Sequence, residues 1–257
     1  MKQNILISIS LVLLMMIFIV SGYQIIRIFK EYKIGEDTYA RLEKYVKLYE
    51  QNLNLSEQGE INDPIVNFDE LKDINEDIVG WIYCDGTVIN YPVVKTNDNI
   101  FYLNHLFDKS INSSGCIFLD SRNKSDFLDQ HNIIYGHHMK NNTMFSSLVE
   151  YKSQEYYDEH PQMLLLTPEK NYKIEIFAGY VSNIEDNAWN LKFSSDEEFE
   201  KWIEQTIKKS CFNSDIVPVR TDRIITMSTC SYEFDNARFV VLGVLKSLSP
   251  EERIIVK

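Results

Sequence analysis

The chain has 257 residues, of which 44% are apolar and 25% charged, a composition that fits a globular domain with a real core and excludes a disordered or fibrous chain. Its 26 Lys and Arg against 38 Asp and Glu give a net charge of −12. A nucleic-acid partner is therefore not expected, because binding to phosphates requires a basic surface. The four cysteines are too few for a disulfide scaffold. None lies in a CxxC pair or at a zinc-finger spacing from a histidine, which excludes structural zinc. We expect neither a metal nor a cofactor.

The first segment, residues 1–28, is predicted to be a transmembrane anchor. No charged residue occurs in 3–26, and a helix of that length, at about 1.5 Å per residue, can cross a hydrocarbon core of about 30 Å. A cleaved signal peptide is the alternative. It is disfavoured because residues 20–22 (VSG) are a weak cleavage site and the apolar run is long for a signal. Three basic residues follow the span and one precedes it, which by charge alone favours a cytoplasmic domain: Lys2 before, and Arg27, Lys30 and Lys33 after.

Residues 29–67 connect this anchor to a folded domain predicted at 68–257. The stretch 31–53 is charged and has apolar residues at helical spacing, which predicts an amphipathic helix. The stretch 51–67 is polar and contains Gly59 and Pro64, as is typical of a spacer.

The domain shows mostly short apolar runs bounded by turn residues, which predict β-strands. Two of these runs flank an Asp-Gly turn at Asp85 and Gly86. The predicted strands are 81–84, 87–94, 116–119, 132–135, 163–167, 171–180, 223–228 and 238–245. Eight strands with few long helices indicate a closed or nearly closed barrel, because closure removes exposed edges. The exception is 194–210, where a serine cap, acids in the first turn and lysines in the last predict a helix inserted late in the domain.

Three predicted strand ends carry residues capable of acyl-transfer chemistry. Cys230 ends one strand, His137 follows another after a glycine, and Arg238 opens the strand after the Cys230 turn. A hairpin would place Arg238 beside Cys230. A thiolate attacks carbonyls, an imidazole moves protons, and a guanidinium can donate to an oxyanion. Each residue alone has an ordinary structural interpretation, as core filler, surface group or salt-bridge partner, so only their combination indicates an active site.

This combination resembles the T-L-x-T-C and G-H signatures of sortases, and further motifs resemble class B sortases. The matching stretches are 226–230 (TMSTC) with Arg238, 135–137 (YGH), 90–94 (NYPVV), 102–105 (YLNH), 115–120 (GCIFLD) and 144–148 (MFSSL). Met227 stands where the signature has Leu, a swap that conserves volume. The resemblance covers roughly residues 68–248, and the predicted helix around Trp202 also agrees with class B.

The resemblance implies an eight-stranded sortase-type β-barrel with an N-terminal helix and a helix before the cysteine strand. It implies a cysteine transpeptidase in which Cys230 attacks after the Thr of an N-P-x-T-N-like sorting motif near the C-terminus of a secreted protein. His137 then moves the protons, Arg238 holds the oxyanion, and the acyl group passes to a peptidoglycan amine. The residues expected to line the peptide groove are Asn99, Leu103, Ser228, Thr229 and Trp189.

By the same resemblance, the domain lies on the extracellular, cell-wall face of a Gram-positive membrane, against the charge count around the span. Two other functions stay open: a membrane-tethered cysteine hydrolase with water as acceptor, and a non-catalytic barrel that binds wall polymer. We expect His138 to face away from Cys230, because adjacent side chains in a strand alternate. The remaining histidines and cysteines are predicted to be structural: His105, His131, His160, Cys84, Cys116 and Cys211.

Overall fold

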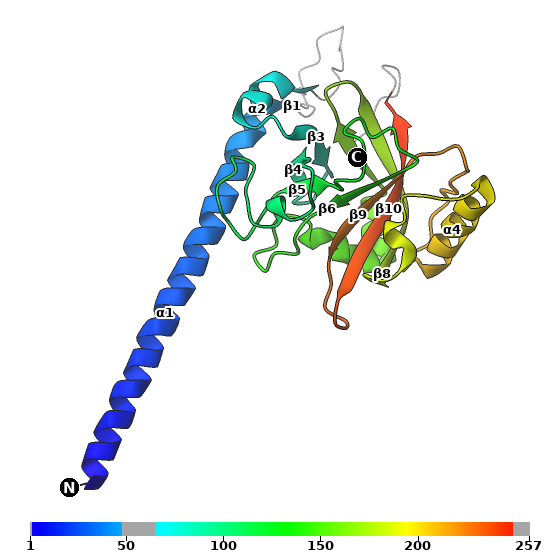
Figure 1. Ribbon diagram of the computed structural model, residues 1–257. Helices are drawn as coiled ribbons and strands as arrows, with labels where there is room; N and C mark the ends of the chain where they lie inside the picture. Colours follow the sequence, from blue (N-terminus) through cyan, green and yellow to red (C-terminus); the bar gives the residue numbers. More distant parts are fainter. Residues whose placement is uncertain (1, 48–64, 249–257) are drawn as a thin grey trace, which may run out of the picture.

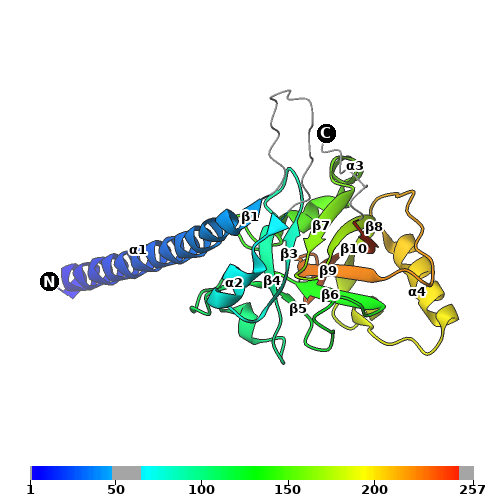
Figure 2. The ribbon, with the colours of Figure 1, turned by 90° about the horizontal axis from the view of Figure 1, so that it is seen from above.

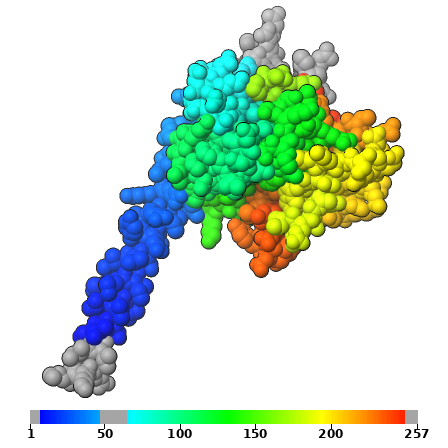
Figure 3. Space-filling model, viewed as in Figure 1, coloured from blue at the N-terminus to red at the C-terminus, as the bar shows by residue number. Residues whose placement is uncertain are grey.

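The structure is a computed structural model that describes residues 2–47 and 65–248 (Figure 1). It shows a β-barrel domain from which one long helix, α1 (Lys2–Leu42), projects as a rod (Figure 3). Most of the predicted spacer, with Gly59 and Pro64, lies outside the described residues. On the opposite side of the barrel from α1 lies a second helix, α4 (Asp196–Lys209) (Figures 1 and 2).

The barrel is closed and has eight strands, which confirms the predicted fold. Its strands are β3 (Ile78–Tyr83), β4 (Asn90–Val94), β5 (Ile117–Leu119), β6 (His131–Tyr135), β7 (Gln162–Leu166), β8 (Asn171–Asn183), β9 (Ile224–Cys230) and β10 (Ala237–Ser247). Their order around the barrel is β10-β8-β7-β3-β4-β5-β6-β9, with β9 and β10 paired to close it. Neighbours are antiparallel except β4 with β5 and β6 with β9. All eight predicted strands are present, with ends that shift by a few residues.

Both faces of β10 are buried, which explains its continuous apolar run. Phe239 and Val241 belong to the core inside the barrel, whereas Val240 and Leu242 pack outside it under α4. Alternate residues of a strand point to opposite faces, so a strand covered on both sides needs apolar residues at every position.

Helix α4 forms where the sequence predicts it. The Ser195 side chain accepts a hydrogen bond from the Glu198 amide, and acids fill the first turn while Lys208 and Lys209 close the last. Its buried face, which includes Phe199 and Trp202, covers the outer surface of β8 and β10. The loop that precedes α4 is thereby held against the barrel.

Helix α1 is long and apolar enough to cross a membrane, and its most apolar stretch of 18 residues has no buried residue. The helix ends at Leu42, earlier than the helix predicted for 31–53, and the chain turns through η1 (Glu43–Tyr45). It ends there because Val46 pairs with Val66, between the strands β1 (Val46–Lys47) and β2 (Ile65–Val66), and this tertiary pairing overrides the helical pattern. The boundary at residue 28 falls within α1 and stays a prediction.

Several short helices were not evident from the sequence pattern. They are α2 (Phe68–Ile74), η2 (Phe101–Leu103), η3 (Ser146–Lys152), α3 (Gln154–Glu159) and η4 (Asn187–Trp189). None is long enough to show a clear helical period. Two of them matter below, because η2 and η4 carry Leu103 and Trp189.

Candidate active site

Strands β9 and β10 bring Cys230 and Arg238 together. Their antiparallel register pairs Cys230 directly with Arg238. Directly opposed residues of an antiparallel pair lie on the same face, with Cβ atoms about 4.5–5.5 Å apart. The guanidinium is further oriented by a hydrogen bond of 2.9 Å from Nη1 to the Ala237 carbonyl. The hairpin therefore sets a fixed cation beside the thiol.

Strand β6 brings His137 to the same end of the barrel. It pairs in parallel with β9 as far as Tyr135 opposite Ser228. Past this point the Gly136 amide donates to the Ser228 carbonyl at 3.1 Å, and Thr229 Oγ1 donates to the Gly136 carbonyl at 2.8 Å. A Cβ on Gly136 would lie 2.4 Å from Ile117 Cδ1 and 2.7 Å from Cγ of the Phe145 ring, so a larger residue would have to displace both side chains.

One nitrogen of the His137 ring is fixed by a hydrogen bond, and the other has no hydrogen-bond partner among the residues that the structure describes. Its Nε2 lies 2.7 Å from the Leu103 carbonyl oxygen. A carbonyl only accepts, so Nε2 carries the hydrogen, and Nδ1 is left to take up or release a proton. The backbone is held as well, because the Phe145 amide donates to the His137 carbonyl at 3.0 Å.

These residues line a cleft of about 340 Å³. All eight residues that the sequence predicts for the site lie around it, namely Cys230, His137, Arg238, Asn99, Leu103, Ser228, Thr229 and Trp189. The cleft is therefore built from the ends of β6, β9 and β10 together with η2 and η4.

The five residues predicted to contact substrate differ in how much they expose. Leu103 is 41% exposed, whereas Ser228 and Thr229 are each 2% exposed and offer little side-chain surface. Asn99 Oδ1 accepts a hydrogen bond of 2.7 Å from the Ser121 amide, which fixes the orientation of its amide group. Trp189, in η4, is half-buried and lines the cleft.

Three apolar residues of the cleft were missed from the sequence: Phe118, Tyr135 and Ile184. Phe118 pairs with Tyr135 across β5 and β6, and their ring centroids lie 5.2 Å apart. The position of Tyr135, directly before the Gly-His motif, was the available signal. Ile184 follows β8, is 47% exposed, and had no signal in the sequence.

A buried carboxylate holds Tyr135 in place. Asp120 is fully buried and accepts hydrogen bonds from the Tyr135 hydroxyl at 2.8 Å and from Arg122 Nη2 at 2.7 Å. Burial alone would raise the pKa of Asp120, but the hydrogen bonds from Arg122 and Tyr135 outweigh it and lower the pKa to about 2. The carboxylate is thus an ionised anchor beneath the wall of the cleft.

His138 does not point away from Cys230, so that expectation is wrong. Its Nδ1 lies 3.0 Å from the Cys230 carbonyl oxygen and donates to it. Strand β6 ends at Tyr135, and the alternation of side chains does not continue into the turn that holds both histidines. His138 therefore contacts the main chain of Cys230.

His131 is buried and bonded through both ring nitrogens. Nδ1 lies 2.6 Å from the Asn190 carbonyl oxygen, and Nε2 lies 2.7 Å from Thr226 Oγ1. Burial lowers its pKa to about 4, against the opposing effect of the bond to Asn190. His131 thereby ties the segment after Trp189 to β6 and β9.

The other three cysteines lie apart from the cleft lining, and all four are free thiols. Burial raises the pKa of Cys84 to about 11 and that of Cys116 to about 12, so both are un-ionised core side chains at neutral pH. Cys211 is exposed. Among the described residues, no three or more His, Cys, Asp or Glu side chains form a group that could hold a metal ion.

Comparison with known proteins places this geometry in a family. The chain is 33% identical to sortase B of Staphylococcus aureus (strain NCTC 8325 / PS 47) over 251 residues, which cover 97% of this chain and 100% of that protein. The chain belongs to the sortase B family. It is a sortase cysteine transpeptidase, and sortases are enzymes of the cell surface. No family model matches the chain.

Solved structures agree with this assignment. A Staphylococcus aureus sortase B–substrate complex matches with a TM-score of 0.68 and 36% identity, covering 71% of this chain and 85% of that one. Sortase B from B. anthracis in complex with AAEK1 matches with a TM-score of 0.73 and 32% identity, covering 86% of this chain and all (100%) of that one. The barrel and the N-terminal helix are thus those of sortase B structures.

Proposed function

We propose that this sortase cleaves a C-terminal sorting motif of secreted proteins, N-P-x-T-N or a relative, after its Thr. It then transfers the protein to an amine of peptidoglycan. The observation that supports this most directly is the register of Cys230 opposite Arg238 at the cleft that also contains His137. The substrate complex of the Staphylococcus aureus relative supports a sorting peptide as the occupant of the cleft.

In the first half of the reaction, the Cys230 thiol gives its proton to His137 Nδ1, and the resulting thiolate adds to the Thr carbonyl carbon, whose oxygen becomes an oxyanion. Arg238 donates to this oxygen from a side chain that is already oriented. The intermediate collapses, the C–N bond breaks, and His137 gives the Nδ1 proton to the departing amine. A thioester on Cys230 remains.

In the second half, an amine enters the cleft and attacks the thioester. His137, now neutral at Nδ1, takes the proton from the attacking nitrogen, and the second tetrahedral intermediate releases the thiolate. Nε2 keeps its hydrogen and its bond to Leu103 throughout, so the ring stays in place while Nδ1 changes protonation.

We place the domain on the outer face of the membrane, with α1 as an uncleaved anchor. The length and composition of α1 support a span, and the cell-surface location of sortases supports the outward orientation. Secreted proteins and wall amines are both accessible on that side.

The experiment that tests the function is incubation with a panel of sorting peptides and candidate amines, followed by mass spectrometry. We expect cleavage after Thr, an adduct on Cys230 of the mass of the acyl fragment, and an amide product only with an added amine. Cys230→Ala removes the only group that forms the acyl enzyme and abolishes both products. Cleavage by Cys230→Ala contradicts the proposal, and efficient release of free acid with every amine favours a hydrolase.

A further inference from the structure

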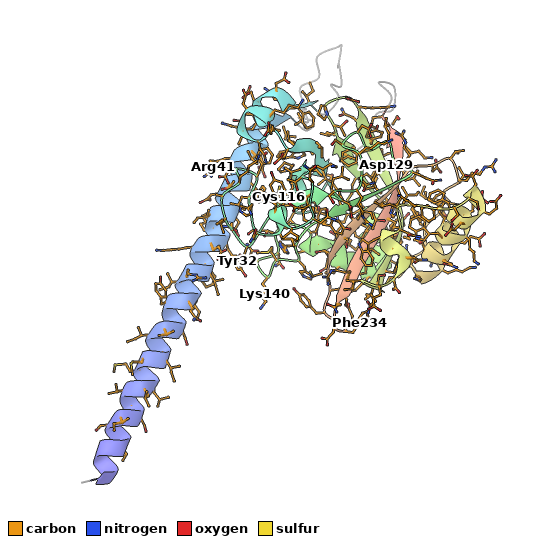
Figure 4. All side chains as sticks on the ribbon, viewed as in Figure 1. Tyr32, Arg41, Cys116, Asp129, Lys140 and Phe234 are labelled. Carbon is orange, nitrogen blue, oxygen red and sulfur yellow. The ribbon has the colours of Figure 1, made fainter. Side chains whose placement is uncertain are left out.

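The C-terminal part of α1, residues 31–42, packs against the domain along one face. Gly35, Thr38, Tyr39 and Leu42 are buried there, at the i, i+3, i+4, i+7 spacing of one helix face. Tyr32 and Arg41 mark this stretch of the helix, and Cys116, just before β5, lies on the adjoining side of the domain (Figure 4). The helix that carries the predicted anchor therefore continues without a break into contact with the domain.

Two loops of the domain receive α1. In 112–115, Asn112 Nδ2 donates to the Glu31 carbonyl and the Ser113 amide donates to Glu31 Oε1, each at 2.8 Å. In the turn after the histidines, Asn141 Nδ2 donates to Glu36 Oε1 at 2.9 Å. Each of these loops also adjoins His137.

The first connection to His137 runs through Gly115. The Tyr39 hydroxyl, buried with its side chain 6% exposed, donates to the Gly115 carbonyl. Gly115 has φ +59, and a Cβ there would lie 3.0 Å from the Leu103 carbonyl oxygen and 3.1 Å from His137 Cδ2. Gly115, whose carbonyl Tyr39 binds, is thus packed against both the Leu103 carbonyl and the His137 ring, which share the hydrogen bond to Nε2.

The second connection runs through Tyr91. Its ring meets that of Tyr39 edge-on, with centroids 5.2 Å apart, and its hydroxyl accepts from the Met144 amide at 3.0 Å. The next amide, that of Phe145, donates to the His137 carbonyl. Both the ring and the main chain of His137 are therefore supported from the same residue of α1.

We propose that docked α1, through Tyr39, positions His137 for catalysis. The helix is then part of the active-site support as well as a tether. The proposal rests on the proposed role of His137 as the proton carrier. Tyr39 touches no reacting atom and is a positioning residue, so its loss misplaces the imidazole rather than removing the chemistry.

The test uses the full chain in lipid nanodiscs and two variants. Tyr39→Phe removes one hydroxyl and keeps the ring against Tyr91. Gly35→Leu wedges α1 away, because even a Cβ at Gly35 would lie 2.8 Å from Ser114 Oγ, whereas Gly22 in the same helix has nothing within 4 Å. Gly22→Leu is the matched control. It adds the same bulk to α1 without touching the domain.

We expect kcat for peptide cleavage to fall about tenfold in both variants with KM changed less than twofold, because misplacing a catalytic group by about 1 Å costs up to about 10²-fold. We also expect a displaced limb in the pH profile of kcat, because the imidazole loses its fixed surroundings. Gly22→Leu keeps the wild-type values. Loss of hydrogen-exchange protection at the Ser113 amide reports the undocking in Gly35→Leu.

A wild-type kcat and a wild-type pH profile in Tyr39→Phe overturn the proposal, whatever the result for Gly35→Leu. The decision rests on Tyr39→Phe because the larger change in Gly35→Leu can unfold the domain. A fall in the folded fraction that accounts for the whole loss of kcat also overturns it. His137→Ala separates this result from failure of the proposed function. If His137→Ala keeps activity, the proton-carrier role is wrong. If it abolishes activity while Tyr39→Phe keeps the wild-type kcat, only the role of Tyr39 is wrong.

Discussion

Acid is expected to destabilise the domain through His131, which the structure keeps neutral. The pKa of His131 falls from 6.5 to about 4 on folding because burial removes the imidazole from water. When the pKa of a group is lower in the folded state than in the unfolded state, its contribution to stability is fully present at pH values above the unfolded-state pKa. That stability is lost as pH falls from about 6.5 toward 4.

The magnitude follows from the two pKa values. With 6.5 unfolded and about 4 folded, linkage gives a loss of about 2 kcal/mol in the free energy of unfolding between pH 7 and pH 5, and about 3 kcal/mol by pH 4. For a domain of this size, about 2 kcal/mol corresponds to about 4–8 °C in the melting temperature. Because other groups titrate in the same pH range, the contribution of His131 is read from the difference in acid destabilisation between wild type and a variant without His131.

The assay is urea unfolding of the domain at several pH values between 7 and 4, for wild type, His131→Phe and Thr226→Val. His131→Phe is less stable at pH 7, because the Asn190 carbonyl and the Thr226 hydroxyl lose their partner, but its stability declines less with acid. Thr226→Val loses a hydrogen bond and keeps the buried imidazole, so its decline follows wild type. Equal declines in wild type and His131→Phe refute the reasoning.

Three further predictions concern the site and the anchor. Arg238→Lys keeps the positive charge and loses the planar guanidinium, so the acylation rate falls by about 10²–10³-fold, almost as far as in Arg238→Ala. A near-wild-type acylation rate in the Lys variant excludes the oxyanion role. His137→Ala nearly abolishes cleavage, whereas His138→Ala, which removes a hydrogen bond to the Cys230 carbonyl and a ring contact with Tyr232, lowers kcat less. The reverse order in a fluorogenic peptide assay means that the wrong histidine was assigned. Removal of residues through Ile28 leaves the docked part of α1 and gives a soluble domain with wild-type peptide cleavage. Loss of cleavage in a truncated protein that is shown to be folded contradicts a purely tethering role for the removed segment.

The barrel could be predicted from the sequence because each strand carries its own local signal. The run 239–245 has no charged or polar side chain and fits a strand buried on both faces, which is how β10 lies. The pairing of Cys230 with Arg238 followed from one hairpin, a local connection. These features require no knowledge of how distant segments meet.

What the sequence did not reveal depends on contacts between distant segments. The early end of α1 reflects the pairing of Val46 with Val66, and the position of Ile184 in the cleft depends on how the chain leaves β8. The orientation of His138 was wrong because strand alternation was extended past the last paired residue, Tyr135. The support of His137 by Tyr39 joins residues nearly a hundred positions apart, and no local pattern reports it.

Two of the histidines differ in a way that matches their proposed roles. His137 and His131 each donate one ring N–H to a carbonyl oxygen, of Leu103 and of Asn190. In His137 the other nitrogen has no fixed partner in the described hydrogen bonds, so the ring gains or loses a proton there without breaking its anchor. In His131 the other nitrogen accepts from Thr226, and protonation forces that hydroxyl to turn round inside the core. His131, at the start of β6, is thus bonded through both ring nitrogens and held neutral by burial, whereas His137, just beyond the end of β6, is anchored through Nε2.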